Sequence, residues 1–302
     1  MSEVDPGTNL TLSIGGSTVD AHYHELGPAN GEPIVFVHTG GAAVSAWMCW
    51  HLTLPFFAGA GYHVFATDSL GYGETQVTAG PSVNNPTFLV ALMDEMGIAK
   101  AHFIGNSGGS MSILSLLGTV PERVLSYTAS GGEPRGFTAE AANHNYQGRS
   151  ARLEFMREYL NQPTLTLDGM KRSTGAFFKD PNHPEVAVCA EMRLATIQRP
   201  HMLEKERAHA ADQLEGKRLQ LVKDEVFQRI QAPTYLIHGG DEPGFYSPED
   251  GPALLDAALR PLHLIPHCDA TVLAGCGHWP QLEKAERYNA LVLSFLRSVH
   301  QD

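Results

Sequence analysis

The chain has 302 residues, of which 43% are hydrophobic, and its formal net charge at pH 7 is −12 with histidine neutral. This length and composition are typical of a globular protein that can bury a sizeable core. The acidic balance argues against a nucleic-acid partner, because phosphate binding needs clustered lysine and arginine. It also means that an anionic substrate would need a local arginine to overcome a repulsive field.

No stretch reaches the roughly 18 uninterrupted apolar residues that a membrane-spanning helix needs. The segment Met1–Pro6 is acidic and lacks the basic-then-apolar layout of a secretion signal. We therefore expect a cytoplasmic protein with no membrane partner and no cofactor. Its cysteines form no C-x-x-C pair, so we expect buried thiols and no metal site. They are Cys49, Cys189, Cys268 and Cys276.

Apolar runs and helical patterns alternate along the first part of the chain. The continuous apolar run Pro33–Val37, for example, suits a strand buried on both faces. Such alternation predicts a parallel sheet covered by helices on both sides. In chain order we expect a hairpin over 8–26, strands over 33–37, 63–67, 101–104 and 124–129, and helices over 45–58, 86–96 and 111–117.

The alternation breaks at Gly131–Pro134, and a helical pattern continues to about Ile230. A helical insertion of this size between strands indicates a cap over the strand ends. We therefore predict a core of residues 1–133 and 231–302, interrupted by a cap of residues 134–230. The helices expected in the cap cover 149–160, 186–198 and 202–225; the core resumes with strands over 233–237 and 270–273 and helices over 250–259 and 285–299.

The pentapeptide Gly105-Asn106-Ser107-Gly108-Gly109 lies between an expected strand and an expected helix. It has the G-x-S-x-G pattern of a nucleophile elbow in the context that this motif needs. A strained turn leaves no room for Cβ atoms beside the serine, which explains the glycines. Ser107 would begin a helix, where backbone N–H groups favour a developing oxyanion. The alternative is an ordinary glycine-rich loop; we predict a nucleophile.

A serine nucleophile needs a base, and in this topology the acid and then the histidine follow it along the chain. Of the 15 histidines, His278 lies just past the last expected strand and before the last helix. We predict that His278 is the base. His38, His102 and His238 lie on or beside strands, and we expect them to be structural.

The acid of the triad has more than one candidate. Asp241 and Glu242 both follow the strand that ends at Ile237. Successive side chains point in different directions, so only one of them can face His278. Glu133, in the loop that opens the cap, is a third candidate.

The predicted oxyanion hole combines two backbone N–H groups. One belongs to Gly108, directly after the nucleophile, and the other comes from the loop after an early strand. In the sequence His38-Thr39-Gly40-Gly41 the second donor is Gly40, with Gly41 beside it. The alternative for this loop is an ordinary tight turn.

With these residues in place, the chain resembles the α/β-hydrolase family over nearly its full length. Within that family it is most similar to the meta-cleavage product hydrolases, the C–C bond hydrolases of aromatic degradation. Three stretches carry this narrower resemblance: Gly105-Asn106-Ser107, the segment Cys276–Glu283 (C-G-H-W-x-Q-x-E), and Arg193 with the residues 195–199 beyond it. The resemblance implies a mostly parallel eight-stranded sheet flanked by helices, an inserted helical cap, and a homo-oligomer.

The resemblance also implies a substrate, a 2-hydroxy-6-oxo-dienoate. His278 would assist ketonisation of the dienol, and Ser107 would then attack the C6 carbonyl, with the oxyanion on Gly40 and Gly108. A stabilised dienolate would leave as the C–C bond breaks, and water would clear the acyl-enzyme.

The same resemblance assigns substrate-binding residues. Arg193 would bind the substrate carboxylate, and so would supply the local positive charge that an acidic protein needs. Trp279 and Phe177 would line the apolar end of the pocket. Asn106 is the asparagine that precedes the nucleophile in the family.

Four departures from the family pattern concern the substrate more than the triad. The position of the triad aspartate falls on Glu242 rather than on Asp241. Cys49 stands where an asparagine is expected, Gly108 stands where a larger apolar residue is usual, and the 38–41 loop is one glycine short. Three other functions therefore stay open: an ester or lactone hydrolase with the same triad, a cofactor-free oxygenase, and a ligand receptor without enzymatic activity.

Overall fold

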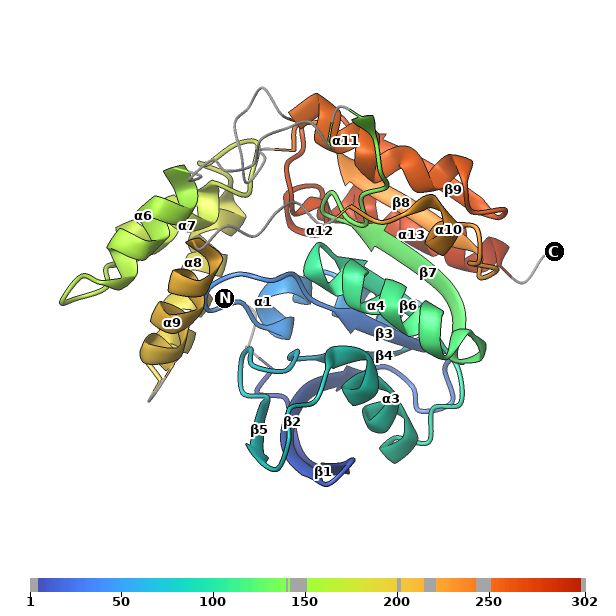
Figure 1. Ribbon diagram of the computed structural model, residues 1–302, viewed down its shortest axis with the longest axis horizontal. Helices are drawn as coiled ribbons and strands as arrows, with labels where there is room; N and C mark the ends of the chain where they lie inside the picture. The colour runs from blue at the N-terminus through green and yellow to red at the C-terminus, as the bar shows by residue number, and fades with distance from the viewer. Residues whose placement is uncertain are drawn as a thin grey trace.

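One sheet organises the chain in the computed structural model, which describes residues 5–139, 141, 151–199, 202–214, 221–242 and 251–299 (Figure 1). Eight strands follow one another in the order β1-β2-β4-β3-β6-β7-β8-β9, and β5 pairs with β2 as a ninth. The strands are β1 (Thr8–Ile14), β2 (Ser17–Leu26), β3 (Pro33–Val37), β4 (His63–Thr67), β5 (Gln76–Ala79), β6 (Ala101–Asn106), β7 (Val124–Ser130), β8 (Thr234–Gly239) and β9 (Cys268–Leu273).

The pairings make the sheet mostly parallel, as predicted. Strand β2 pairs antiparallel with β1, β4 and β5, whereas β4, β3, β6, β7, β8 and β9 pair in parallel along the sheet. The eight predicted strands are therefore confirmed, and β5 is an addition. All four residues of β5 are exposed, so no buried apolar alternation marks it in the sequence.

Helices cover both faces of the sheet. They are α1 (Ala46–Trp50), α2 (Leu54–Gly59), α3 (Asn85–Glu95), α4 (Gly108–Thr119), α6 (Ala151–Leu160), α7 (Leu167–Gly175), α8 (Pro184–Ile197), α9 (Met202–Leu214), α10 (Asp224–Phe227), α11 (Gly251–Leu259), α12 (Pro280–Glu283) and α13 (Ala285–Ser298), with short 3₁₀ turns at Pro121–Arg123 and Arg260–His263.

Strand β3 shows how the two faces separate. Ile34 and Phe36 pack in a buried cluster with residues of α1, α2 and α13. Val35 and Val37 pack in a different cluster with residues of α3 and α4. Because successive strand residues point to opposite faces, a continuous apolar run is what a doubly covered strand requires.

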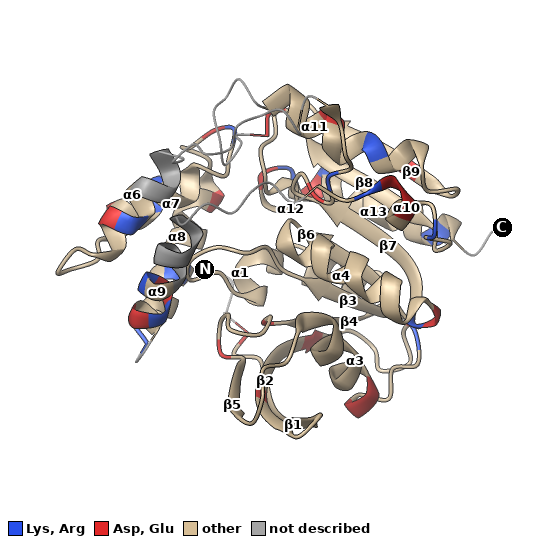
Figure 2. Ribbon diagram, in the orientation of Figure 1, with Lys and Arg blue, Asp and Glu red and all other residues tan. Residues whose placement is uncertain are grey.

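Four helices, α6 to α9, lie beside the sheet and come between β7 and β8 in the chain (Figure 1). They share a small apolar cluster that includes Tyr159, Met170 and Ile197, and Ala43 of the core joins it. Farther along, Phe227 of α10 packs back into a cluster of the sheet. The described parts of α6 and α9 carry charges of both signs, whereas α4 carries none (Figure 2).

Two expected helices are divided in the structure. The stretch 45–58 forms α1 and α2, because Pro55 has no N–H to donate back to the preceding turn. In the stretch expected over 202–225, α9 covers Met202–Leu214, residues 215–220 lie outside the described part, and α10 begins separately at Asp224 after the non-helical residues 221–223. Helices α7 and α12 were not predicted from the sequence, and residues 149–150 and 250 of the predicted helices lie outside the described part.

None of the described helices combines the length and apolar character needed to cross a bilayer.

Ile104 tests the packing of the central strand, since it is fully buried between the sheet and its helices. We expect Ile104→Ala to lower the free energy of unfolding by about 2–5 kcal/mol, through lost burial and the cavity that remains. Urea denaturation measures this. Val77→Ala on the exposed strand β5 is the control, and an equal loss in both variants would contradict this description of the core.

Candidate active site

Ser107 stands between β6 and α4 with backbone angles φ +52° and ψ −117°. A positive φ is strained for a residue with a side chain. The chain tolerates it because the elbow packs closely: a Cβ on Gly109 would lie 2.1 Å from the carbonyl oxygen of Val37. The Ser107 N–H donates to the Ser130 carbonyl oxygen at 2.9 Å, which ties the turn to β7.

His278 and Glu242 form a buried pair. Glu242 Oε1 lies 2.6 Å from His278 Nδ1, and the side chains are at most 3% exposed. A carboxylate only accepts, so Nδ1 donates and the neutral ring has its lone pair on Nε2. Burial alone would raise the pKa of Glu242, but the charge and hydrogen bond of His278, with Arg135, hold it below its ordinary value.

The other two acid candidates face elsewhere. Asp241 Oδ2 accepts from the Gly275 N–H at 2.9 Å, and Asp241 Oδ1 lies 2.8 Å from Lys179 Nζ. Glu133 is partly buried and pairs with Arg135. Among the three candidates, the structure therefore brings only Glu242 into a hydrogen bond with His278.

The loop that carries His278 is hydrogen-bonded to the segment between α7 and α8, which belongs to the helices inserted between β7 and β8. The His278 N–H donates to the Phe177 carbonyl oxygen at 2.8 Å. Glu283 Oε2 accepts from the Gly277 N–H at 2.6 Å, and its Oε1 accepts from the Lys179 N–H at 2.9 Å. A Cβ on Gly277 would lie 2.6 Å from the Phe177 oxygen, so the approach requires glycine. Sequence reasoning gave Glu283 no role, although it ends the C-G-H-W segment.

Asn106 joins the elbow to the same loop. Its Nδ2 lies 3.1 Å from Ser130 Oγ and 3.3 Å from both the His278 carbonyl oxygen and Gln281 Oε1. Gln281 in turn donates to Cys49 Sγ at 3.2 Å, and burial raises the pKa of that thiol to about 12. Asn106 and Cys49 are both fully buried and bonded to protein groups.

The loop expected to supply an oxyanion donor lies against the elbow. A Cβ built on Gly108 would be 3.5 Å from the Gly40 nitrogen, so these two glycines are neighbours. Gly41 follows with φ +132°. His38, at the start of the loop, donates from Nδ1 to the Thr39 carbonyl oxygen at 2.6 Å and accepts from the Ser69 N–H at 2.8 Å.

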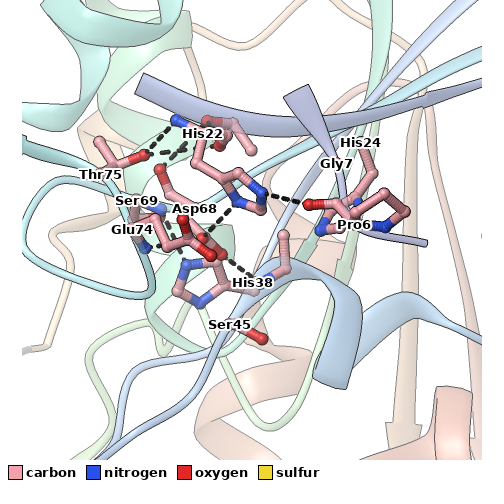
Figure 3. Close-up of polar contacts among 12 residues, drawn as sticks. Pro6, Gly7, His22, His24, His38, Ser45, Asp68, Ser69, Glu74 and Thr75 are labelled. Atoms are coloured by element: carbon pink, nitrogen blue, oxygen red, sulfur yellow. Dashed lines mark hydrogen bonds and ion pairs between the residues drawn. The ribbon is translucent and has the colours of Figure 1, made fainter. Parts of the chain in front are cut away.

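The buried carboxylate of Asp68 accepts hydrogen bonds from three parts of the chain near the 38–41 loop (Figure 3). Its Oδ1 accepts from the Ala46 N–H at 2.7 Å, and its Oδ2 accepts from the Glu74 N–H at 3.0 Å and from His22 Nδ1 at 2.9 Å. His22 Nε2 also lies 3.0 Å from the Pro6 carbonyl oxygen. Burial alone would lower the pKa of His22, but Asp68 outweighs burial and raises it to about 8.

Arg193 of α8 enters the space between cap and core with only 1% of its surface exposed. Its Nε and Nη2 donate to the Ala42 carbonyl oxygen at 3.0 and 2.9 Å, and its Nη1 donates to Thr174 Oγ1 at 2.9 Å. Among the described residues it has no carboxylate in ion-pair contact. Burial lowers the pKa of Arg193 to about 10, so it stays charged at neutral pH.

The aromatic ring of Phe177 lies near both Arg193 and His278 and stacks on that of Trp279. Phe177 stacks on Trp279 with ring centroids 4.0 Å apart, and its centroid lies 5.6 Å from that of His278. The guanidinium carbon of Arg193 lies 6.0 Å from the centre of the Phe177 ring. The predicted binding residues Arg193, Phe177 and Trp279 thus form one contiguous group beside the His278–Glu242 pair.

A strained serine after a strand, a buried histidine–carboxylate pair and two adjacent glycines are the parts of a serine hydrolase. The sequence pattern of the alpha/beta hydrolase fold matches residues 32–285, and the chain belongs to this family.

The most similar relatives include two hydrolases named for 2-hydroxy-6-oxononadienedioate and 2-hydroxy-6-oxononatrienedioate. The one from Burkholderia vietnamiensis is 29% identical over 93% of this chain and 92% of its own length. The one from Paraburkholderia phymatum is 28% identical over the same shares.

Similar solved structures include a 2-hydroxy-6-oxo-6-phenylhexa-2,4-dienoate hydrolase from Rhodococcus, with a TM-score of 0.76, 21% identity, and 96% and 99% of the two chains covered. A meta-cleavage product hydrolase from Pseudomonas fluorescens gives a TM-score of 0.74 at 24% identity, covering 96% and 98%. These structures show the shared fold. The expected family resemblance is confirmed.

The two adjacent acids offer a test. We expect Glu242→Gln to slow the reaction of Ser107 with an organophosphonate by about 100-fold or more, because the amide no longer orients and charges the imidazole. Asp241→Asn should change the rate by less than about 3-fold. Intact-mass spectrometry over time measures both rates, and a reversed order would contradict the pairing.

His22 gives a pH prediction. Because its folded pKa is raised to about 8, the stabilisation it contributes is complete below its unfolded value and is lost as the pH rises through 8. We expect the free energy of unfolding of the wild type to fall relative to His22→Gln by about 1–2 kcal/mol across that window. Urea titrations of both proteins at several pH values check this, and parallel curves would refute it.

Proposed function

We propose that the protein is a serine-dependent C–C bond hydrolase of 2-hydroxy-6-oxo-dienoates, the products of meta-cleavage of aromatic rings. The observation that carries the proposal is Arg193. A buried guanidinium without a carboxylate partner among the described residues is costly, and a substrate carboxylate would offset that cost. Arg193 donates three hydrogen bonds to described residues, and a guanidinium has five N–H groups, so two N–H groups without a described partner can donate to an anion.

The proposed mechanism assigns one order of events to these side chains. The substrate carboxylate lies at Arg193, and its C6 carbonyl lies at Ser107. His278 first moves a proton from the 2-hydroxyl to C5, which converts the dienol to a ketone. His278 then takes the Ser107 proton as the hydroxyl attacks C6, and the negative charge on the substrate oxygen is stabilised by the N–H groups of Gly40 and Gly108.

Collapse of this oxyanion breaks the C5–C6 bond. The electrons pass into the dienolate, which is stabilised by conjugation and accepts a proton on leaving. Water, deprotonated by His278, then hydrolyses the acyl group from Ser107 and releases a carboxylic acid. Glu242 keeps the proton of His278 on Nδ1 throughout and stabilises the imidazolium each time it forms.

The remaining predicted residues divide into two groups. Phe177 and Trp279 supply the apolar wall for the substituent on C6. Asn106 and Cys49 act through other residues: both are fully buried, and they join the elbow to the histidine loop through Gln281. Asp241, which pairs with Lys179, takes no part in the chemistry under this proposal.

The names of the relatives support this substrate class. Two relatives that align over more than nine-tenths of this chain are named for 2-hydroxy-6-oxo dienoic and trienoic diacids. We also propose a cytoplasmic homo-oligomer, as the resemblance implies; size-exclusion chromatography with light scattering tests the assembly.

The direct test is incubation with 2-hydroxy-6-oxo-6-phenylhexa-2,4-dienoate, following the loss of its visible absorbance. We expect turnover in the wild type and a loss of about 1,000-fold or more in Ser107→Ala. Persistent colour together with hydrolysis of a small aryl ester would identify an esterase or lactonase instead. Oxygen consumption that survives Ser107→Ala would identify a cofactor-free oxygenase.

Arg193 has its own prediction. Arg193→Met keeps much of the side-chain volume but removes the charge, and we expect kcat/KM for the dienoate to fall by about 100-fold or more. Hydrolysis of an uncharged aryl ester should change far less. Arg157→Gln, which removes an exposed cation from cap helix α6, is the matched control. Equal losses on both substrates would show that Arg193 only supports the fold.

A further inference from the structure

A second cavity, of about 490 Å³, lies at the junction of cap helix α8 with the core. Ser107, His278 and Arg193 are absent from its described lining, so it is separate from the candidate active site. Its volume is within the usual range for small-molecule sites. Trp47, Leu52, Val188 and Met192 supply apolar walls from both sides of the junction.

The described lining of this cavity has an excess of negative charge. Two of its carboxylates have cationic partners: Arg199 Nη1 lies 2.6 Å from Glu74 Oε1, and His22 Nδ1 lies 2.9 Å from Asp68 Oδ2. His51 lies 3.0 Å from Glu185. If both of these histidines are protonated, five carboxylates face three cations, which leaves a net charge of −2. The five carboxylates are those of Asp5, Asp68, Glu74, Glu185 and Glu191.

His24, whose side chain is drawn in Figure 3, also lines this cavity. Only 2% of the residue is exposed, and its Nδ1 lies 2.9 Å from Asp5 Oδ2. Because a carboxylate only accepts, Nδ1 carries the proton and Nε2 carries a lone pair. Burial lowers the pKa of His24, which keeps the ring neutral. Among the described residues no hydrogen bond to Nε2 is present, and His24 lines the cavity, so Nε2 is available to accept a hydrogen bond from a ligand there.

We propose that this cavity is a second binding site, for an organic ammonium ion with an apolar body. An ammonium N–H would satisfy His24 Nε2, and its charge would offset the excess of carboxylates. The hydrocarbon part would pack against Trp47, Leu52 and Met192. A metal ion fits less well, because no described group of three histidine, cysteine, aspartate or glutamate side chains could hold one.

Such a ligand would bridge two parts of the molecule. Val188 and Met192 belong to α8, and Trp47 belongs to α1 of the core. Arg193 projects from another face of α8, because successive helical residues are about 100° apart. The ligand would therefore fasten the cap helix that carries Arg193 without occupying the space that we assign to the substrate.

Isothermal titration calorimetry with benzylamine, which is a cation at neutral pH, tests the site. We expect saturable binding to one site per chain, weakened by salt, and benzyl alcohol and benzoate should bind at least about 10-fold more weakly. Blocking Ser107 with an organophosphonate should leave benzylamine binding unchanged. Absent binding, equal binding of benzoate, or loss of binding on blocking Ser107 would each overturn the proposal.

Two substitutions in the lining of the cavity test whether benzylamine binds there. Val188→Lys places a cation on the exposed wall of the cavity, and we expect it to weaken benzylamine binding by about 10-fold or more. Glu191→Gln should weaken it by about 3-fold, whereas Glu286→Gln, an exposed change on α13, should have no effect. Thermal unfolding checks that each variant is folded. Unaltered affinity in folded Val188→Lys would place the ligand elsewhere and refute the site.

Discussion

The backbone of Ser107 is the constraint on which the rest of this structure depends. At φ +52° the serine departs from the conformation its neighbours in β6 and α4 adopt, and it does so at a cost of about 1–3 kcal/mol. The sheet below and the helix after it leave the chain no relaxed alternative, since Gly109 packs directly on the Val37 carbonyl. The turn brings the Gly108 N–H beside Gly40 and lets Asn106 reach the histidine loop. One strained residue thus fixes the relative positions of three separate loops.

Charge is the second organising factor. The protein is strongly acidic, yet it buries a guanidinium at the junction of cap and core. The Ala42 carbonyl oxygen and Thr174 Oγ1 orient Arg193 but cannot neutralise it. Among the described residues Arg193 has no carboxylate in ion-pair contact, so under the proposed function the carboxylate of the substrate supplies the opposite charge. The described lining of the cavity beside α8 has an excess of carboxylates, so the two proposed sites, one for a carboxylate and one for an ammonium ion, lie on neighbouring faces of one helix.

Local patterns were enough to predict most of the sheet and the order serine, acid, histidine. They succeeded where a short-range signal exists, as in the apolar run of β3 or the glycines around Ser107. They failed where the decisive contact is distant: β5 is exposed and forms only because β2 offers an unpaired edge. Asp241 and Glu242 are equally suitable in sequence, and the direction of the backbone after β8 decides which of them meets His278. The break between α1 and α2, by contrast, has a local cause that can be read in the sequence, namely Pro55.

Glu283 has a consequence for how the cap can move. Its two oxygens clamp the backbone of Gly277, beside the catalytic base of the proposed mechanism, to that of Lys179 in the inserted segment. A displacement of residues 177–180 away from the core would therefore break these bonds or move the His278 loop with it, because the His278 N–H also donates to the Phe177 carbonyl oxygen. The position of the inserted segment and the position of the His278 loop are therefore coupled through a single carboxylate.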